Sequence, residues 1–106
     1  MKTSVIFTTC PNDAEARSLA RTLVEEKLVA CAQIIPPCVS VYSWEGAVQE
    51  SSEHLLILKT QKKLIARVET RVMELHSYDT PEFVALEAQH VAPQYKKWIK
   101  SVSNVE

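Results

Sequence analysis

The only glycine of the chain, Gly46, lies between two long stretches with strand-like composition. Glycine adopts positive φ without steric cost, so the backbone is expected to turn within Ser40 to Gly46. The flanking stretches, residues 31–42 and 47–60, are each about twice the usual strand length of roughly 5–6 residues. The pattern predicts a long β hairpin. A domain of this size cannot cover it with its own helices, so other chains are expected to cover its edges and apolar side chains.

Two features of this hairpin constrain its packing. Pro36 and Pro37 remove two backbone donors from the first arm, which predicts a kink or bulge there. In the second arm, Leu55 to Leu58 are apolar on both faces, which predicts a strand buried on both sides. One side would face the domain's own helices and the other a neighbouring chain.

The remaining segments alternate between strand and helix patterns. In chain order we expect a strand over residues 3–9, a helix capped by Asn12 or Asp13, a helix from about Gln61 to His76, a strand over 83–88, and a helix over 93–102 with Tyr95, Trp98, Ile99 and Val102 facing inward. With the hairpin between the first two helices, this order predicts an α+β ferredoxin-like sandwich with an additional C-terminal helix. Helices would cover one face of an antiparallel sheet, and the other face would stay open.

Length and composition predict a single domain over residues 1–106. No apolar run approaches the roughly 18 residues of a membrane span, so no membrane partner is expected. A formal net charge of −1 offers no field that would attract nucleic acid. The first residues lack a secretory signal pattern, which predicts a cytosolic location and three free cysteine thiols.

Motifs typical of enzymes are missing from the sequence. It contains no glycine-rich phosphate loop, no GxSxG turn and no HExxH, so a non-enzymatic protein is expected. His54, His76 and His90 lack an i,i+4 histidine partner, so any metal site must combine distant segments or several subunits. Each histidine taken alone is more often structural.

Two parts of the sequence nevertheless contain residues that are suited to ligand or metal binding. Cys31 and Cys38 fit the role of small buried apolar residues, whereas Cys10 lies at a strand end before a helix, where either a reactive thiolate or a buried thiol is expected. Residues 76–82 place an imidazole, a phenol and two carboxylates on one loop, which fits either a binding site or a well-capped turn before Pro81. Lys59 and Trp44 are expected to be covered by a partner subunit.

Several ordered motifs together resemble the CutA divalent-cation-tolerance family over nearly the whole chain. They are Glu26 to Ala32, Ile35-Pro36, the Tyr-x-Trp-x-Gly of Tyr42 to Gly46, Ile57 to Thr60, the His-x-Tyr-x-x-Pro-Glu of His76 to Glu82, and Tyr95-x-x-Trp98. The resemblance implies a ferredoxin-like fold, a tight homotrimer with long hairpins pairing between subunits, a likeness to PII-type signalling trimers, and a role in the response to copper and other divalent cations.

This chain departs from the family at two positions. Ser77 replaces the usual proline after the histidine, and Thr8 stands where proposed copper-binding members carry a cysteine. Because side chains alternate along a strand, Cys10 lies on the same side as Thr8 and can present a thiol nearby. A thiolate with an imidazole suits copper better than magnesium, and Glu82 can add an oxygen ligand.

We therefore expect a cytosolic homotrimer that binds copper or another divalent metal at an intersubunit cleft. The metal ligands would be Cys10, His76 and Glu82, with Lys59 and Tyr78 lining the cleft as ligand-binding residues. Two alternatives stay open. One is a PII-like regulatory trimer that binds a small anionic effector through Lys59, and the other is a structural interaction scaffold.

Overall fold

The computed structural model describes residues 1–104. In chain order its elements are β1 (Thr3–Cys10), α1 (Asp13–Glu25), β2 (Cys31–Ile34), β3 (Cys38–Trp44), β4 (Ala47–Gln61), the 3-10 turn η1 (Lys62–Leu64), α2 (Ile65–Leu75), β5 (Val84–Glu87) and α3 (Pro93–Val102). This confirms the predicted α+β order, with the first hairpin arm divided into β2 and β3.

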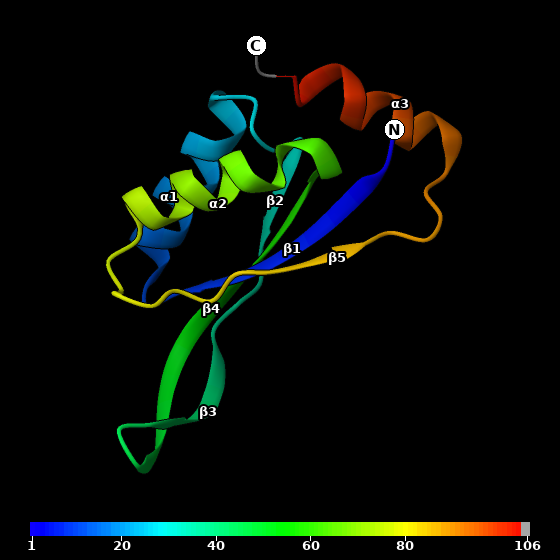
Figure 1. The fold of residues 1–106 in the computed structure, drawn as a ribbon. Helices are drawn as coiled ribbons and strands as arrows, with labels where there is room; N and C mark the ends of the chain where they lie inside the picture. The colour runs from blue at the N-terminus through cyan, green and yellow to red at the C-terminus, as the bar shows by residue number, and fades with distance from the viewer. Residues whose placement is uncertain (105–106) are drawn as a thin grey trace.

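The strands form one antiparallel sheet in the order β2-β4-β1-β5, and β3 pairs with the outer half of β4. Helices α1 and α2 lie together on one face of the sheet (Figure 1). The core between these layers is formed by inward side chains such as Ile6, Leu56, Leu58, Leu23 and Val72, all fully buried. The ferredoxin-like sandwich expected from the sequence is therefore confirmed.

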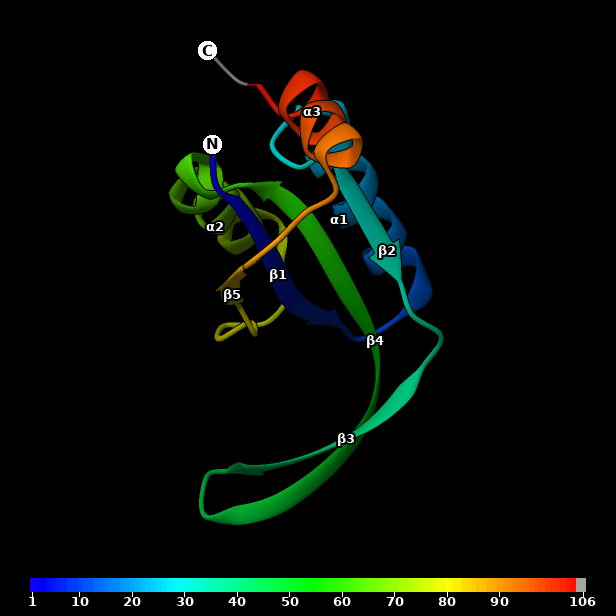
Figure 2. The same cartoon turned by 90° about the vertical axis from the view of Figure 1, so that its right-hand side faces the viewer.

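The β3–β4 hairpin projects away from the body of the domain (Figure 2). Its outer residues pair from Cys38 opposite Glu53 to Trp44 opposite Ala47. Glu45 and Gly46 form the two-residue turn, with φ of 51° and 79°. Two positive φ angles are typical of the hairpin turns whose twist matches that of the flanking strands. Gly46 therefore accounts for one of the two positive φ angles of the turn. Glu45 adopts the other, which is strained for a residue with a Cβ.

The kink expected at the two prolines is a complete break between strands. β2 ends at Ile34, and β3 begins at Cys38. The Ile35 N–H still donates to the Leu55 carbonyl over 2.8 Å, so pairing with β4 persists up to the first proline. The break directs the outer hairpin away from the sheet.

Both ends of α1 are formed by local signals. The Asn12 side chain accepts the Glu15 N–H over 2.8 Å, as a helix N-cap does. At the other end Lys27 has a φ of 62°, the Lys27 N–H donates to Val24, and the Leu28 N–H donates to Leu23. This is a Schellman termination with lysine at the position usually held by glycine. It directs Leu28 and Val29 into the core.

The sheet face opposite α1 and α2 is largely uncovered in the described chain. Leu55 and Ile57 are half-buried, while Val84 and Leu86 on the neighbouring β5 are 50% and 54% exposed. Helix α3 covers only one end of this face, where the Gln61 side chain donates to the Ser103 carbonyl. Burial of β4 by its own helices is thus confirmed for Leu56 and Leu58, and burial of its other side by a neighbouring chain stays a prediction.

The expectation for α3 needs one correction. Ile99 is fully buried as predicted, but Tyr95 and Trp98 are 39% and 42% exposed rather than inward-facing. A helix that covers only the end of a sheet has one buried stripe, so the two aromatic rings lie at its margin and pack on each other with centroids 5.4 Å apart.

Candidate metal site

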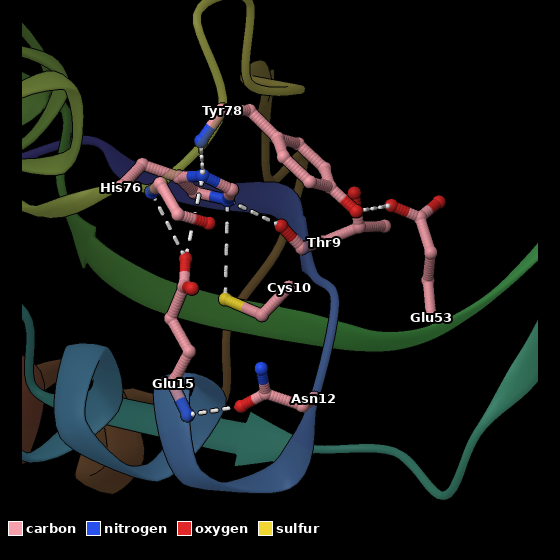
Figure 3. A network of polar contacts seen from close by, with 8 residues as sticks. Thr9, Cys10, Asn12, Glu15, Glu53, His76 and Tyr78 are labelled. Carbon is pink, nitrogen blue, oxygen red and sulfur yellow. Dashed lines mark hydrogen bonds and ion pairs between the residues drawn. The ribbon is translucent and has the colours of Figure 1, made fainter.

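Three segments meet where β1 ends, and together they bring a thiol, a carboxylate and an imidazole into contact (Figure 3). Cys10 is the last residue of β1, Glu15 lies in the first turn of α1, and His76 follows α2. One ligand atom from each side chain lies within 4.8 Å of the other two. They form a group of residue types that can hold a metal ion.

Backbone partners determine the state of the His76 ring. Its Nε2 lies 2.6 Å from the Thr9 carbonyl oxygen, which can only accept, and its Nδ1 lies 3.0 Å from the Tyr78 amide, which can only donate. The proton is therefore on Nε2, and the ring is neutral. In this arrangement the imidazole ties the end of β1 to the loop after α2.

Glu15 bridges the same two segments from the helix side. Its Oε2 accepts the Ser77 N–H over 3.1 Å and lies 3.5 Å from His76 Nδ1. A glutamate three residues after an N-cap usually turns back to the N-cap backbone. Here its carboxylate contacts a loop 62 residues away along the chain.

Cys10 is fully buried, and its Sγ lies 4.0 Å from His76 Nε2. Burial first, and then the charges of Glu15 and Glu53, raise the pKa of this thiol to about 12. Without a bound cation Cys10 is therefore a protonated, buried thiol. The helix N-terminus nearby does not turn it into a thiolate, so of the two roles left open for Cys10 the metal-free protein shows the buried one.

Tyr78 and Glu82 are both influenced by the Glu53 carboxylate. The Tyr78 hydroxyl donates to Glu53 Oε2 over 3.0 Å, and burial followed by this bond raises the pKa of the phenol to about 12. Loss of water around the carboxyl, and then repulsion from Glu53, raise the pKa of Glu82. Glu82, which was expected to be a metal ligand, is not part of the group formed by Cys10, Glu15 and His76.

Lys59 lies elsewhere. Its strand partners are Val5 and Cys31, whereas Cys10 pairs with His54, five residues away along β4 and thus about 17 Å at strand spacing. Its Nζ donates to Gln33 Oε1 over 2.9 Å and lies 5.7 Å from the centre of the Tyr95 ring. Within one chain the structure brings Cys10, His76 and Tyr78 together and leaves Lys59 apart.

Sequence reasoning missed Glu15 and Glu53. Glu15 lies three residues after Asn12, which is the spacing of a helix-capping glutamate, and Glu53 lies in a polar stretch of the hairpin. Neither residue was therefore predicted to belong to a site. A usable signal for Glu15 was its position five residues after Cys10, across a turn that reverses the chain direction. Glu53 carried no such signal, because its burial depends on the loop after α2 folding over it.

Comparison with known proteins gives consistent matches over nearly the whole chain. A family model described as CutA1 divalent ion tolerance protein matches residues 4–102. Divalent-cation tolerance protein CutA of Thermus thermophilus is 40% identical over 96 residues, which cover 91% of this chain and 93% of that protein. The chloroplastic CutA of Arabidopsis thaliana is 42% identical over 97 residues, 92% of this chain.

Solved structures agree with these sequence matches. CutA1 from Oryza sativa superposes with a TM-score of 0.95 at 38% identity, covering 98% of this chain and 95% of that one. The chain spans about half the length of its mouse and Arabidopsis relatives, 56% and 53% respectively. Among residues 1–104, no helix is both long and apolar enough to cross a membrane. From fold, motifs and similarity together, the chain belongs to the CutA1 divalent ion tolerance family.

Proposed function

We propose that the protein is a non-enzymatic, cytosolic homotrimer that serves divalent-cation tolerance by binding copper or another divalent metal. The observation that carries this proposal is the pair formed by the Cys10 thiol and the His76 imidazole, 4.0 Å apart, with carboxylates close by. The family's link to divalent ions supports the metal, and the exposed apolar hairpin and sheet face support the trimer.

The donor set fits a soft or borderline transition metal. Thiolate and imidazole ligands suit copper and zinc, whereas magnesium and calcium require mainly oxygen ligands. Binding would supply the positive charge that lets the Cys10 thiol lose its proton and that offsets the surrounding carboxylates. Coordination through Nε2 would cost the His76 ring both backbone hydrogen bonds, because Nε2 would leave the Thr9 carbonyl and the ring proton would move to Nδ1, which accepts the Tyr78 N–H in the metal-free protein.

Metal titration of the metal-free protein tests this function. We expect saturable binding of Cu²⁺ or Zn²⁺ and no binding of Mg²⁺ at the same concentrations. Cys10→Ser and His76→Ala should each weaken binding by well over tenfold, because a site with few ligands loses much of its affinity with each one.

Two exposed groups of the same chemistry serve as controls. Cys38→Ser and His90→Ala remove an exposed thiol and an exposed imidazole and should leave the affinity unchanged. If the Cys10→Ser/His76→Ala double variant binds copper as the parent does, the ions occupy adventitious surface groups, and the metal-binding proposal is wrong.

A second candidate function is regulation by a small anionic effector, as in PII-type trimers. Lys59 favours it: this cation is half-buried on the open sheet face and is held by a neutral amide and an aromatic ring. Calorimetry with a panel of nucleotides and carboxylates would detect such a ligand. Lys59→Met should abolish its binding, while Lys100→Met on α3 should not.

A further inference from the structure

Three different segments of one chain supply Cys10, Glu15 and His76, and each position is fixed by the backbone. Cys10 is held in the β1–β4 ladder opposite His54. Glu15 is held by the first turn of α1, whose cap is the Asn12 side chain. His76 is held through the Thr9 carbonyl and the Tyr78 amide. The three ligand atoms are therefore positioned without a contribution from a second subunit (Figure 3).

The spacing of these atoms is close to that of a tetrahedral site. With metal–sulfur and metal–nitrogen bonds of about 2.3 and 2.1 Å, tetrahedral geometry separates sulfur from nitrogen by about 3.6 Å. The observed separation of Sγ and Nε2 is 4.0 Å, and all three donor atoms lie within 4.8 Å of one another. Closing such a site would take small side-chain movements together with release of the Thr9 carbonyl, which lies 2.6 Å from His76 Nε2 in the metal-free protein.

His54 lies opposite Cys10 on the neighbouring strand β4. His54 pairs with Cys10 across the ladder, so both side chains lie on the helix-covered face of the sheet. Its Nε2 lies 3.8 Å from Asp13, but its Nδ1 is buried and has no hydrogen-bond partner among the described residues. Buried polar atoms are nearly always satisfied, so this nitrogen has an unused capacity for a hydrogen bond on the same face of the sheet as Cys10.

Glu82 is less suited to be the oxygen ligand. Its electrostatic neighbour is Glu53, and it lies outside the group of three. Glu15 instead places its carboxylate 3.5 Å from the His76 ring, and its side chain is only 19% exposed. The Glu15 carboxylate is therefore placed where it could bind a metal ion held by Cys10 and His76.

We propose that the oxygen ligand of the metal site is Glu15, so that Cys10, Glu15 and His76 of a single chain hold one borderline ion such as Zn²⁺. This inference rests on the proposed metal-binding function and makes it more specific. It places the site under the helix layer of each chain, with one ion per chain, and does not use the Glu82 carboxylate.

Glu15→Gln and Glu82→Gln form the deciding pair of variants, with Zn²⁺ for affinity and Co²⁺ as the spectroscopic probe. The amide introduced by Glu15→Gln can still accept the Ser77 N–H, and thermal melting of the metal-free variant checks that the fold is kept. Glu15→Asp is the second variant, because it keeps the charge but withdraws the carboxylate. We expect Glu15→Gln and Glu15→Asp to weaken Zn²⁺ binding at least tenfold, and Glu82→Gln to change it less than twofold.

Cobalt reports directly on the sulfur ligand. The parent and Glu82→Gln should show thiolate-to-cobalt charge-transfer absorption that saturates at one ion per chain, and Cys10→Ser should lose it. If Glu82→Gln weakens binding while Glu15→Gln does not, the inference is wrong, yet the metal-binding function stands with another oxygen ligand. If the parent shows neither saturable Zn²⁺ binding nor the charge-transfer band, the metal-binding function itself fails.

Discussion

At the scale of single residues, Tyr78 and Glu53 show how this end of the domain satisfies a buried carboxyl group. Glu53 is only 8% exposed, and the donor found for it is a neutral phenol over 3.0 Å. A buried carboxylate that loses its donor keeps its desolvation cost without compensation. The position of Tyr78 is therefore fixed by its bond to Glu53 as well as by its place in the loop.

Replacing Tyr78 with phenylalanine tests this contact. The change removes one hydroxyl and should lower the free energy of unfolding by about 1–3 kcal/mol, measured by denaturant titration. Thr70→Val is the control, because the Thr70 hydroxyl donates to the Ala66 carbonyl on the exposed side of α2, and its loss should change stability by less than about 0.5 kcal/mol. Equal effects of the two variants would contradict the role given to Tyr78.

The Cys10 thiol predicts a dependence of stability on pH. Its pKa is raised from 9.0 to about 12, so the folded protein holds this proton more tightly than the unfolded chain does. The stability contributed by the neutral thiol is complete below pH 9 and is lost as the pH rises toward 12. The slope due to this group reaches at most about 1.4 kcal/mol per pH unit.

Cys10→Ala isolates this contribution. The alanine variant should be less stable than the parent at neutral pH, and the difference should shrink as the pH rises above about 9, because the parent then loses its advantage. Melting temperatures of the two metal-free proteins across this range would show it. A difference that stays constant would mean that the thiol ionises in the folded protein as easily as in the unfolded chain.

At the scale of elements, the segments that follow periodic patterns were predictable, and those that depend on distant contacts were not. The apolar spacing of α1 and the Pro93 start of α3 each predicted a helix where the structure has one. The inward orientation of Tyr95 and Trp98 was wrong, because a sequence period cannot tell how far a helix extends over its sheet. Likewise, the sequence predicted that Cys10 and His76 belong to one site, because the expected fold places them at the same end of the domain. The position of Glu15 beside them is visible only in the tertiary structure.

The C-terminal end of α1 gives a prediction at this scale. Lys27 holds a φ of 62°, a conformation that costs a residue with a Cβ roughly 1–2 kcal/mol, while glycine adopts it freely. Lys27→Gly should therefore stabilise the protein by about 0.5–1 kcal/mol, after allowance for the greater freedom of glycine in the unfolded chain.

Lys27→Ala is the matched control for this change. It removes the same side chain but keeps the Cβ strain, so its stability should stay within about 0.5 kcal/mol of the parent. Urea unfolding of the three proteins would compare them. A stabilisation by alanine as large as that by glycine would show that the lysine charge, and not its backbone conformation, is unfavourable.

At the scale of the whole molecule, a single chain leaves much apolar surface without a covering layer. The hairpin carries three valines that are 62–76% exposed, Val39, Val41 and Val48. On the open sheet face, Leu86 is 54% exposed. Large contiguous apolar patches are rare on monomeric proteins, so the exposed valines of the hairpin and Leu86 on the open face favour contact with other chains. This exposed surface is the physical basis for proposing that chains assemble, and the number three is what the resemblance to the CutA family implies.

The assembly can be tested by mass. Three chains of 12.0 kDa should give a particle of about 36 kDa by light scattering, with a large interface of the obligate kind. Leu86→Glu should then lower the particle mass or prevent folding, because it would bury an unpaired charge between subunits. Met73→Glu on α2 is the matched control: Met73 is 41% exposed on the helix layer, away from the open face, and its replacement should leave the trimer intact.

A stable folded monomer of the parent at micromolar concentration would contradict the trimer. The metal site inferred from Cys10, Glu15 and His76 would be unaffected by that result, since all three ligands come from one chain.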